Sequence, residues 1–214
     1  MWLTKPIALL SALSLGVHSV SGRIEEQEVI KLDGYDRPKM GVGHFSEWSR
    51  MRKRLFWEDW QADKMSEWIL VMGNEGGDTD SLTSALTWAY HLMHSTQNTS
   101  DPLKAVALLQ TPADALDLRP ENVLAIKMAK MSAQHRDLLN INELPEDVET
   151  LAPKLRGIVL VDHPAPLRRW KDAKVLSIMD HHVDEGAAPD AKPRIFEKVS
   201  RFVQKTLNLL AEYV

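Results

Sequence analysis

Four short apolar segments most constrain how this chain can fold. They are WILVM at 68–72, KAVALLQ at 104–110, GIVLVD at 157–162 and VLSIMD at 175–180. Each has the length of a strand, and each is mainly apolar instead of alternating between apolar and polar residues. Such runs, separated by helices, are typical of parallel strands that are covered on both faces. The sequence therefore predicts an α/β fold: a parallel sheet with helices on both faces.

Helical patterns precede and separate these strands. The expected helices cover 45–60, 82–93, 120–134 and 145–153. Pro120 is suited to the first position of the third helix, and Leu124, Met128 and Met131 lie on one face of it. The stretch between the last two helices has no clear pattern. Strands that alternate with helices in this way favour one layered domain.

Composition excludes several kinds of site and partner. The chain has 214 residues, enough for one domain with a buried core. It has no cysteine, so disulfides and thiolate metal sites are excluded, and a metal must be bound by carboxylate, imidazole or amide groups. The net charge is −4 without a long basic run, which argues against a nucleic-acid partner. We expect no membrane span.

The first 22 residues have the order of a secretory signal peptide. Lys5 precedes the apolar stretch at 6–17, and small residues follow as far as Gly22. An apolar N-terminal helix in a cytoplasmic protein is the alternative, so a secretory and a cytoplasmic location both stay open. Residues 23–44 are polar with scattered glycine and proline, and we expect them to form a connector.

A glycine-rich loop, GNEGGDTDS at 73–81, follows the first strand and carries three acidic side chains. Glycine loops between a strand and a helix usually bind phosphate through the backbone, and acidic groups repel phosphate. The third and fourth strands also end in acids, Asp162 and Asp180. Because the carboxyl ends of parallel strands meet at one edge of a sheet, we expect these two residues to converge with Asp78 and Asp80.

Converging carboxylates repel one another unless a cation lies among them. His163, His181 and His182 directly follow the acids that end the strands. Aspartate and histidine without cysteine indicate a divalent-metal site, with two ions as the simplest arrangement, and the metal would then hold phosphate. Taken alone, Asp80 could cap a helix and Asp162 could serve a turn. Their combination at strand ends favours the metal site.

These segments resemble the DHH phosphoesterase superfamily. The Asp-His-His triplet that names it stands at 180–182, the glycine loop is similar to its first motif, and LVDHP at 160–164 is similar to its second. The Gly-Asn-Glu opening resembles the exopolyphosphatase and prune branch, because family-II pyrophosphatases typically have histidine where Asn74 stands. The resemblance covers about 68–196. It implies a parallel-sheet domain with two metal ions, usually Mn²⁺, with Mg²⁺ or Co²⁺ as alternatives.

The resemblance also implies a role for each metal ligand. Asp78 would ligate one ion and Asp80 the other. Asp162 would bridge the two ions, and His181 would ligate the second. These four residues are the metal ligands that we expect.

Three further residues are expected to be catalytic. The resemblance implies that His182 faces the phosphate, where it could stabilise charge or protonate the leaving group. Asp180 would support the site by orienting His181 or its neighbours. Asn74 would have a weaker role, through a polar contact or through a water molecule.

The implied activity is hydrolysis of phosphoric anhydrides, with inorganic polyphosphate as the first substrate and pyrophosphate or a nucleotide phosphoester next. The family pattern continues beyond the triplet with a fourth motif and a basic C-terminal domain. We expect that domain to be absent, with 45–200 as the catalytic domain and 201–214 as a short helix. A catalytically weak or inactive module that binds metal or a protein partner is the alternative, and an oligonucleotide phosphodiesterase is a further one.

Overall fold

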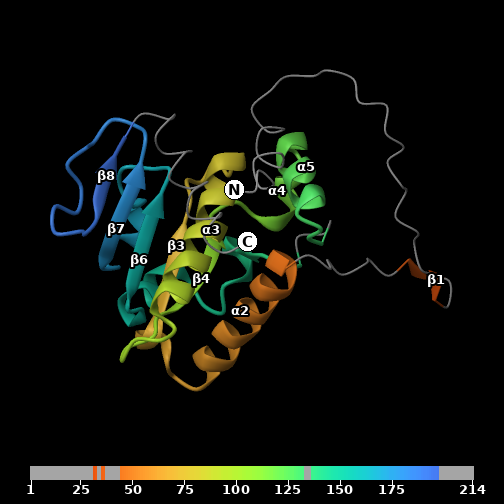
Figure 1. Ribbon diagram of the computed structural model, residues 1–214, viewed down its shortest axis with the longest axis horizontal. Helices are drawn as coiled ribbons and strands as arrows, with labels where there is room; N and C mark the ends of the chain where they lie inside the picture. The colour runs from red at the N-terminus through yellow and green to blue at the C-terminus, as the bar shows by residue number, and fades with distance from the viewer. Residues whose placement is uncertain (1–30, 33–34, 37–43, 133–135, 198–214) are drawn as a thin grey trace, which may run out of the picture.

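The described part of the chain is the region that contains all four predicted strands. The structure, a computed structural model, describes residues 31–32, 35–36, 44–132 and 136–197 (Figure 1). The predicted signal peptide at 1–22 and the predicted C-terminal helix at 201–214 lie outside the described residues. Within the predicted connector, Lys31–Leu32 (β1) pairs antiparallel with Tyr35–Asp36 (β2).

Six parallel strands form the central sheet, in the order β5-β4-β3-β6-β7-β8 (Figure 1). Their bounds are Trp68–Met72 (β3), Lys104–Leu109 (β4), Leu139–Asn140 (β5), Gly157–Val161 (β6), Val175–Asp180 (β7) and Arg194–Phe196 (β8). The four predicted strands are confirmed, and β3 and β6 are buried along their whole length. Two edge strands, β5 and β8, were not predicted, because two and three residues are too few to form a recognisable apolar run.

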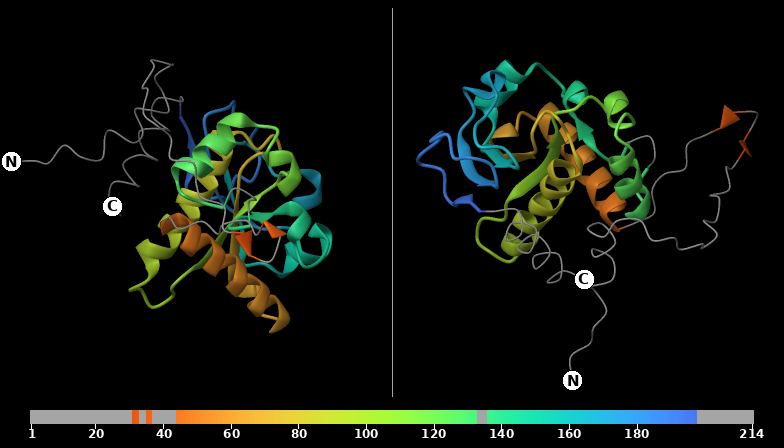
Figure 2. Two further views of the ribbon diagram at one scale, coloured as in Figure 1. Left: turned by 90° about the vertical axis from the view of Figure 1, so that its right-hand side faces the viewer. Right: turned by 90° about the horizontal axis from the view of Figure 1, so that it is seen from above.

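Helices cover both faces of this sheet, as predicted (Figure 2). The α-helices are His44–Gln61 (α2), Thr79–Thr96 (α3), Ala113–Leu116 (α4), Pro120–Met128 (α5) and Val148–Leu151 (α6). Short 3₁₀ turns are Met65–Glu67 (η1), Ile141–Glu143 (η2), Ala152–Lys154 (η3) and Arg168–Trp170 (η4). Helices α3, α4 and α5 bury side chains on one face, α6 and η4 on the other, and α2 contributes to both.

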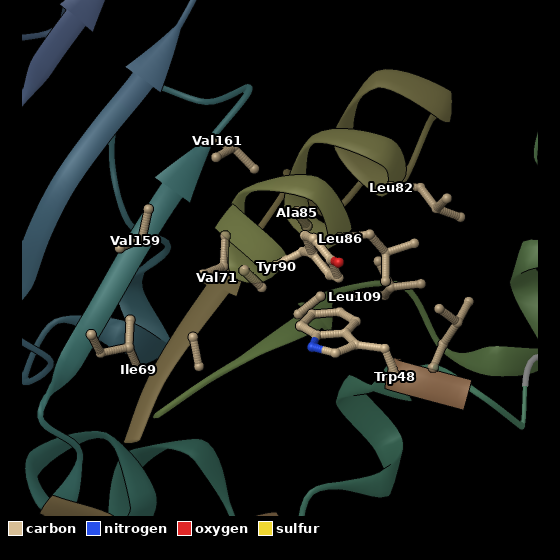
Figure 3. Close-up of a cluster of buried hydrophobic side chains, with 14 of the residues drawn as sticks. Trp48, Ile69, Val71, Leu82, Ala85, Leu86, Tyr90, Leu109, Val159 and Val161 are labelled. Carbon is tan, nitrogen blue, oxygen red and sulfur yellow. The ribbon is translucent and has the colours of Figure 1, made fainter. Parts of the chain in front are cut away.

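Successive residues of each strand enter different hydrophobic clusters. On β3, Ile69 and Val71 pack with Leu86 of α3, whereas Leu70 packs on the opposite face with Trp170 of η4. Figure 3 shows the first cluster between α3, β3, β6 and the indole of Trp48 from α2. This alternation explains why β3 and β6 are apolar at every position, since both faces of the sheet lie under helices.

The third predicted helix, α5, ends at Met128 and not near Gln134. Lys130 has a left-handed backbone with φ 53°, and the N–H of Met131 donates to the carbonyl of Ile126 at 3.0 Å. This is the geometry in which a helix stops with its last carbonyls satisfied. The apolar pattern continues past the end of the helix because Met131 is buried in the core without being helical.

The strand order brings the carboxyl ends of β3 and β6 side by side. From β3 the chain proceeds outward through β4 to β5, and it then returns to the other side of β3 to form β6, β7 and β8. Ligand sites of open parallel sheets lie at such a reversal. The acidic loop follows β3, and Asp162 follows β6, so both meet at this position. Among the described residues, no helix is both long and apolar enough to cross a bilayer.

Candidate functional site

Two groups of potential metal ligands lie at the carboxyl edge of the sheet and share Asp162. The Asp group consists of Asp78, Asp80 and Asp162, and the His group of Asp162, Asp180, His181 and His182. Within each group, one ligand atom per residue lies within 4.8 Å of those of the other members. The expected convergence of the four aspartates is therefore present, and His163 belongs to neither group. The individual ligand roles stay predictions.

The acidic loop turns directly into α3. Asp78 caps this helix, because its Oδ1 accepts a hydrogen bond from the N–H of Ser81 at 3.2 Å. Asp80, the residue that the sequence suggests as a possible cap, lies instead in the first turn of the helix. Gly77 has φ 58°, a left-handed conformation that glycine adopts without strain, and its N–H donates to Asn74 Oδ1 at 3.1 Å. The tight turn thus places two carboxylates at the start of α3.

Asp162 is held in one orientation by hydrogen bonds to both of its carboxylate oxygens. Its Oδ2 accepts from Ser81 Oγ at 2.6 Å and from Asn74 Nδ2 at 2.8 Å, and its Oδ1 lies 2.8 Å from His181 Nε2. The residue is 1% exposed, and its φ of 61° is an uncommon backbone conformation for a residue other than glycine. Non-glycine residues in this conformation occur preferentially at functional sites.

Asp180 is fully buried at the end of β7 and supports the two histidines that follow it. Its Oδ1 accepts from the backbone N–H of His181 at 2.8 Å and lies 2.7 Å from Nδ1 of His182. The ring that Asp180 orients is therefore that of His182, and it holds His181 only through the backbone. The His181 ring instead lies between Asp162 and Asp80, with Nε2 at 3.4 Å from Asp80 Oδ2. Support of a neighbouring histidine was among the expectations, and the geometry identifies which one.

The carboxylates of the Asp group have opposed pKa shifts. Burial, a hydrogen bond with Asp78 and the charges of Asp162 and Asp78 raise the pKa of Asp80 to about 6. Burial also acts to raise the pKa of Asp78, but hydrogen bonds from Asp80 and Ser81 and the charge of Arg119 lower it overall. Burial, with the charge of Asp78, raises the pKa of Asp162. The site thus holds negative charge that the surrounding groups only partly compensate.

In the His group, the contact with Asp180 has the largest effect on the pKa of His182. The hydrogen bond to the Asp180 carboxylate raises the pKa of His182, whose side chain is 49% exposed. By contrast, burial lowers the pKa of His163, and its Nδ1 lies 3.0 Å from the carbonyl of Val161. The contact with Asp180 therefore favours the protonated form of His182, whereas burial favours the neutral form of His163.

Several neutral side chains that position the loop were not identified from the sequence. Ser81 holds both Asp162 and the backbone N–H of Asn74, the latter at 2.9 Å. Asn122 Nδ2 donates to the carbonyl of Gly77 at 2.6 Å, and Gln110 Nε2 donates to the carbonyl of Gly73 at 2.7 Å. Ser81 directly follows Asp80 in the loop motif, and that adjacency was the one available signal for any of them.

The donor set fits a divalent cation. It combines carboxylate oxygens and imidazole nitrogens, which Mn²⁺ and related ions accept. Within the described part of the chain, Asp180 Oδ2 is buried and has no hydrogen-bond partner, which is costly for a carboxylate unless positive charge lies nearby. Asp162, shared by both groups, could contact two cations at once. The acidic character of the glycine loop is thereby explained by the cation that it can hold.

Comparisons with known proteins agree with this geometry. The chain is 30% identical over 164 residues to a Schizosaccharomyces pombe protein named "Putative exopolyphosphatase", covering 74% of this chain and 40% of that protein. It is 27% identical over 119 residues to a Bacillus velezensis protein named "Probable manganese-dependent inorganic pyrophosphatase", covering 54% of this chain and 31% of that protein. The aligned part thus spans less than half the length of either relative. The family model described as "DHH family, N-terminal domain" matches residues 68–207, which include both groups of ligands, and the chain belongs to the DHH family.

Proposed function

We propose that this chain is a metal-dependent hydrolase of phosphoric anhydrides that releases phosphate from inorganic polyphosphate. The observation that carries the proposal is the position of Asp162 in both ligand groups, because a carboxylate shared by two sets of donors can contact two cations at once. The names of the two relatives support this class of substrate, and one of them supports manganese as the metal.

Asp78, Asp80, Asp162 and His181 are the residues that we propose to hold two divalent ions, with Mn²⁺ preferred over Mg²⁺ or Co²⁺. When bound, such ions supply Lewis acidity, which neutralises charge on phosphate oxygens and lowers the pKa of water. Ser81 and Asn74 keep Oδ2 of Asp162 occupied by hydrogen bonds and leave Oδ1 directed toward His181. The neutral side chains therefore determine which carboxylate oxygen is available in the shared position.

His182 is the proposed proton donor to the leaving group. Its Nδ1 lies against Asp180 Oδ1, so Nε2 is the nitrogen left to meet a substrate, and the contact with Asp180 raises the pKa of the ring. As a water oxygen forms a bond to the terminal phosphorus and releases one proton to the solvent, the bond from phosphorus to the bridging oxygen breaks. A proton from His182 Nε2 passes to that bridging oxygen. Asp180 stabilises the imidazolium before the transfer and fixes the orientation of the ring.

Phosphate release from polyphosphate by the purified 214-residue chain tests the proposal. We expect release that depends on added Mn²⁺ and that is reduced by at least about 100-fold in Asp162→Asn, which keeps the shape of the side chain and removes its charge. Asp172→Asn is the matched control, because Asp172 is 54% exposed and precedes β7 at the opposite edge of the sheet. Release that is independent of metal, or equal in the two variants, would contradict the proposed site.

Pyrophosphate is the second candidate substrate, supported by the name of the Bacillus relative. The same assay with pyrophosphate and with longer polyphosphate compares the two. A value of kcat/KM that is higher for the longer chain supports exopolyphosphatase action. A higher value for pyrophosphate would instead assign the chain to the second activity.

A further inference from the structure

The start of α5 is fixed against the acidic loop by one buried amide. Asn122 is 0% exposed, its Nδ2 donates to the carbonyl of Gly77 at 2.6 Å, and its Oδ1 accepts from Thr79 Oγ1 at 3.0 Å. Both ends of the amide are therefore occupied by the residues that flank Asp78. Because the amide is buried and bonded at both ends, the first turn of α5 cannot shift without leaving polar atoms unpaired.

This attachment places Arg119, the residue before α5, beside the glycine loop. Its Nη2 lies 3.6 Å from the point that a β-carbon on Gly76 would occupy, and Asn74 Oδ1 lies 2.9 Å from the same point. The guanidinium of Arg119 thus lies next to the glycine loop at Gly76.

The Arg119 guanidinium keeps capacity to bind an anion. Its ion pair with Glu121 spans 3.5 Å, and its side chain is 38% exposed. Within the described ranges, no hydrogen bond from this guanidinium is present, although the group has five N–H donors. Guanidinium groups bind phosphate with two parallel hydrogen bonds, which gives both affinity and orientation.

Arg119 also lies outside both ligand groups. Cations in those groups would neutralise the phosphoryl group under attack, whereas further phosphates of a polyphosphate chain would still carry negative charge near Asp78 and Asp80. A cation beyond the glycine loop compensates that charge. This division of roles predicts that Arg119 matters more for a long substrate than for a short one.

We propose that Arg119 binds a phosphate group of the substrate beyond the two that the cleaved anhydride bond joins, and that it thereby sets a preference for longer polyphosphate over pyrophosphate. This inference rests on the proposed function of the same site. It adds a specificity-determining contact supplied by the residue before α5, which lies outside the motifs that carry the family resemblance.

The test compares Arg119→Gln, Arg119→Lys and the control Arg54→Gln in the full chain with Mn²⁺. Arg54 is suited as the control because its side chain is 70% exposed on α2 and forms a pair at 3.5 Å with Glu58. For longer polyphosphate we expect kcat/KM to fall by at least about tenfold in Arg119→Gln, the loss typical of a charge-assisted hydrogen bond. For pyrophosphate we expect a change within about threefold, and Arg119→Lys should lie between, because it keeps the charge without the planar fork.

Equal losses for pyrophosphate and longer chains would overturn the inference, since they would place Arg119 at the cleaved phosphoryl group. No loss for either substrate would overturn it as well. If the unaltered chain releases no phosphate, the proposed function fails, and binding of an imido-linked triphosphate, measured by calorimetry with Mn²⁺, then decides the role of Arg119. Binding weakened at least about fivefold in Arg119→Gln relative to Arg54→Gln would support it, and equal binding would contradict it.

Discussion

Ser81 provides the sharpest test of how the site is held together. This serine is 1% exposed, and its hydroxyl donates to Asp162 Oδ2 at 2.6 Å while accepting from the backbone N–H of Asn74 at 2.9 Å. The substitution Ser81→Ala removes one oxygen atom and both hydrogen bonds without adding bulk. Asp162 would then be held at Oδ2 by Asn74 alone.

The expected loss is in metal affinity. A hydrogen bond to a charged group contributes about 1.5 to 3 kcal/mol, and a factor of ten in affinity corresponds to about 1.4 kcal/mol. If this energy orients Asp162 for the cation, the affinity for Mn²⁺ should fall by about 10- to 100-fold, as is typical for residues that support metal ligands. The hydrogen bond from Ser81 also lowers the pKa of Asp162 against the effect of burial. Its removal raises that pKa, so protons should compete more strongly with the metal in Ser81→Ala.

Calorimetric titration of the full chain with Mn²⁺ at about pH 5.5 and about pH 8 measures both effects. We expect a larger loss of affinity at the lower pH, because the protonated fraction of Asp162 is greater there. Ser84→Ala is the matched control, since Ser84 lies one turn further along α3 and is also buried at 5% exposure. Affinity that is unchanged in Ser81→Ala, or lowered equally in Ser84→Ala, would refute the claim that Ser81 positions the ligand.

Three further substitutions test the charge and the geometry of the loop. Because the pKa of Asp80 is raised from 3.8 to about 6 in the folded protein, its protonated form stabilises the fold below pH 3.8, and this stabilisation is lost as the pH rises through about 6. At neutral pH, Asp80→Asn should therefore raise the melting temperature of the metal-free protein. The same substitution should weaken Mn²⁺ binding. If the melting temperature of Asp80→Asn in EDTA equals that of the unaltered chain, ionised Asp80 does not destabilise the metal-free fold, and the argument is wrong. Gly77→Ala would force a β-carbon onto Thr111 Oγ1 at φ 58°, and denaturant unfolding should show a loss of about 1 to 3 kcal/mol or more. Asn122→Ala leaves the carbonyl of Gly77 and the hydroxyl of Thr79 without their hydrogen-bond partner, which should lower the free energy of unfolding by about 1 to 3 kcal/mol in the same measurement. An unchanged free energy of unfolding would contradict the claim that Asn122 fixes α5 to the start of α3.

The four central strands were predictable because burial on both faces leaves a direct mark on the sequence. Every residue of β3 and of β6 is buried, so each reads as an unbroken apolar run. The edge strand β8 lacks this mark, since its three residues are all only partly buried. The buried face of α5 was mispredicted for a related reason. Leu124 and Met128 are 54% and 38% exposed, while the buried face carries Asn122 and Ile126, so apolar periodicity pointed to the wrong side of the helix.

The position of the acidic residues was also predictable, because parallel topology alone brings strand ends together. The hydrogen bonds among them were not. Ser81 reaches across to Asp162, which is 81 positions away, and Asn122 reaches back 45 positions to Gly77. Such partners depend on how α3 and α5 pack, and no local pattern in the sequence records that packing. Neutral serine and asparagine are common in loops and caps, which hides their role at a site.

The two oxygens of Asp162 explain how a cluster of acids can persist in a buried place. Oδ2 is neutralised in part by two fixed hydrogen-bond donors, Ser81 and Asn74, so it needs no counter-ion. Oδ1 is directed away from them, toward His181 Nε2 at 2.8 Å and within 3.9 Å of His182 Nδ1. A proton on one of these rings supplies a single positive charge to this oxygen, whereas a divalent ion supplies more charge to several donors at once. We therefore expect protons and a divalent cation to compete for this one carboxylate oxygen, so that the metal affinity and its pH dependence in the proposed chemistry are coupled.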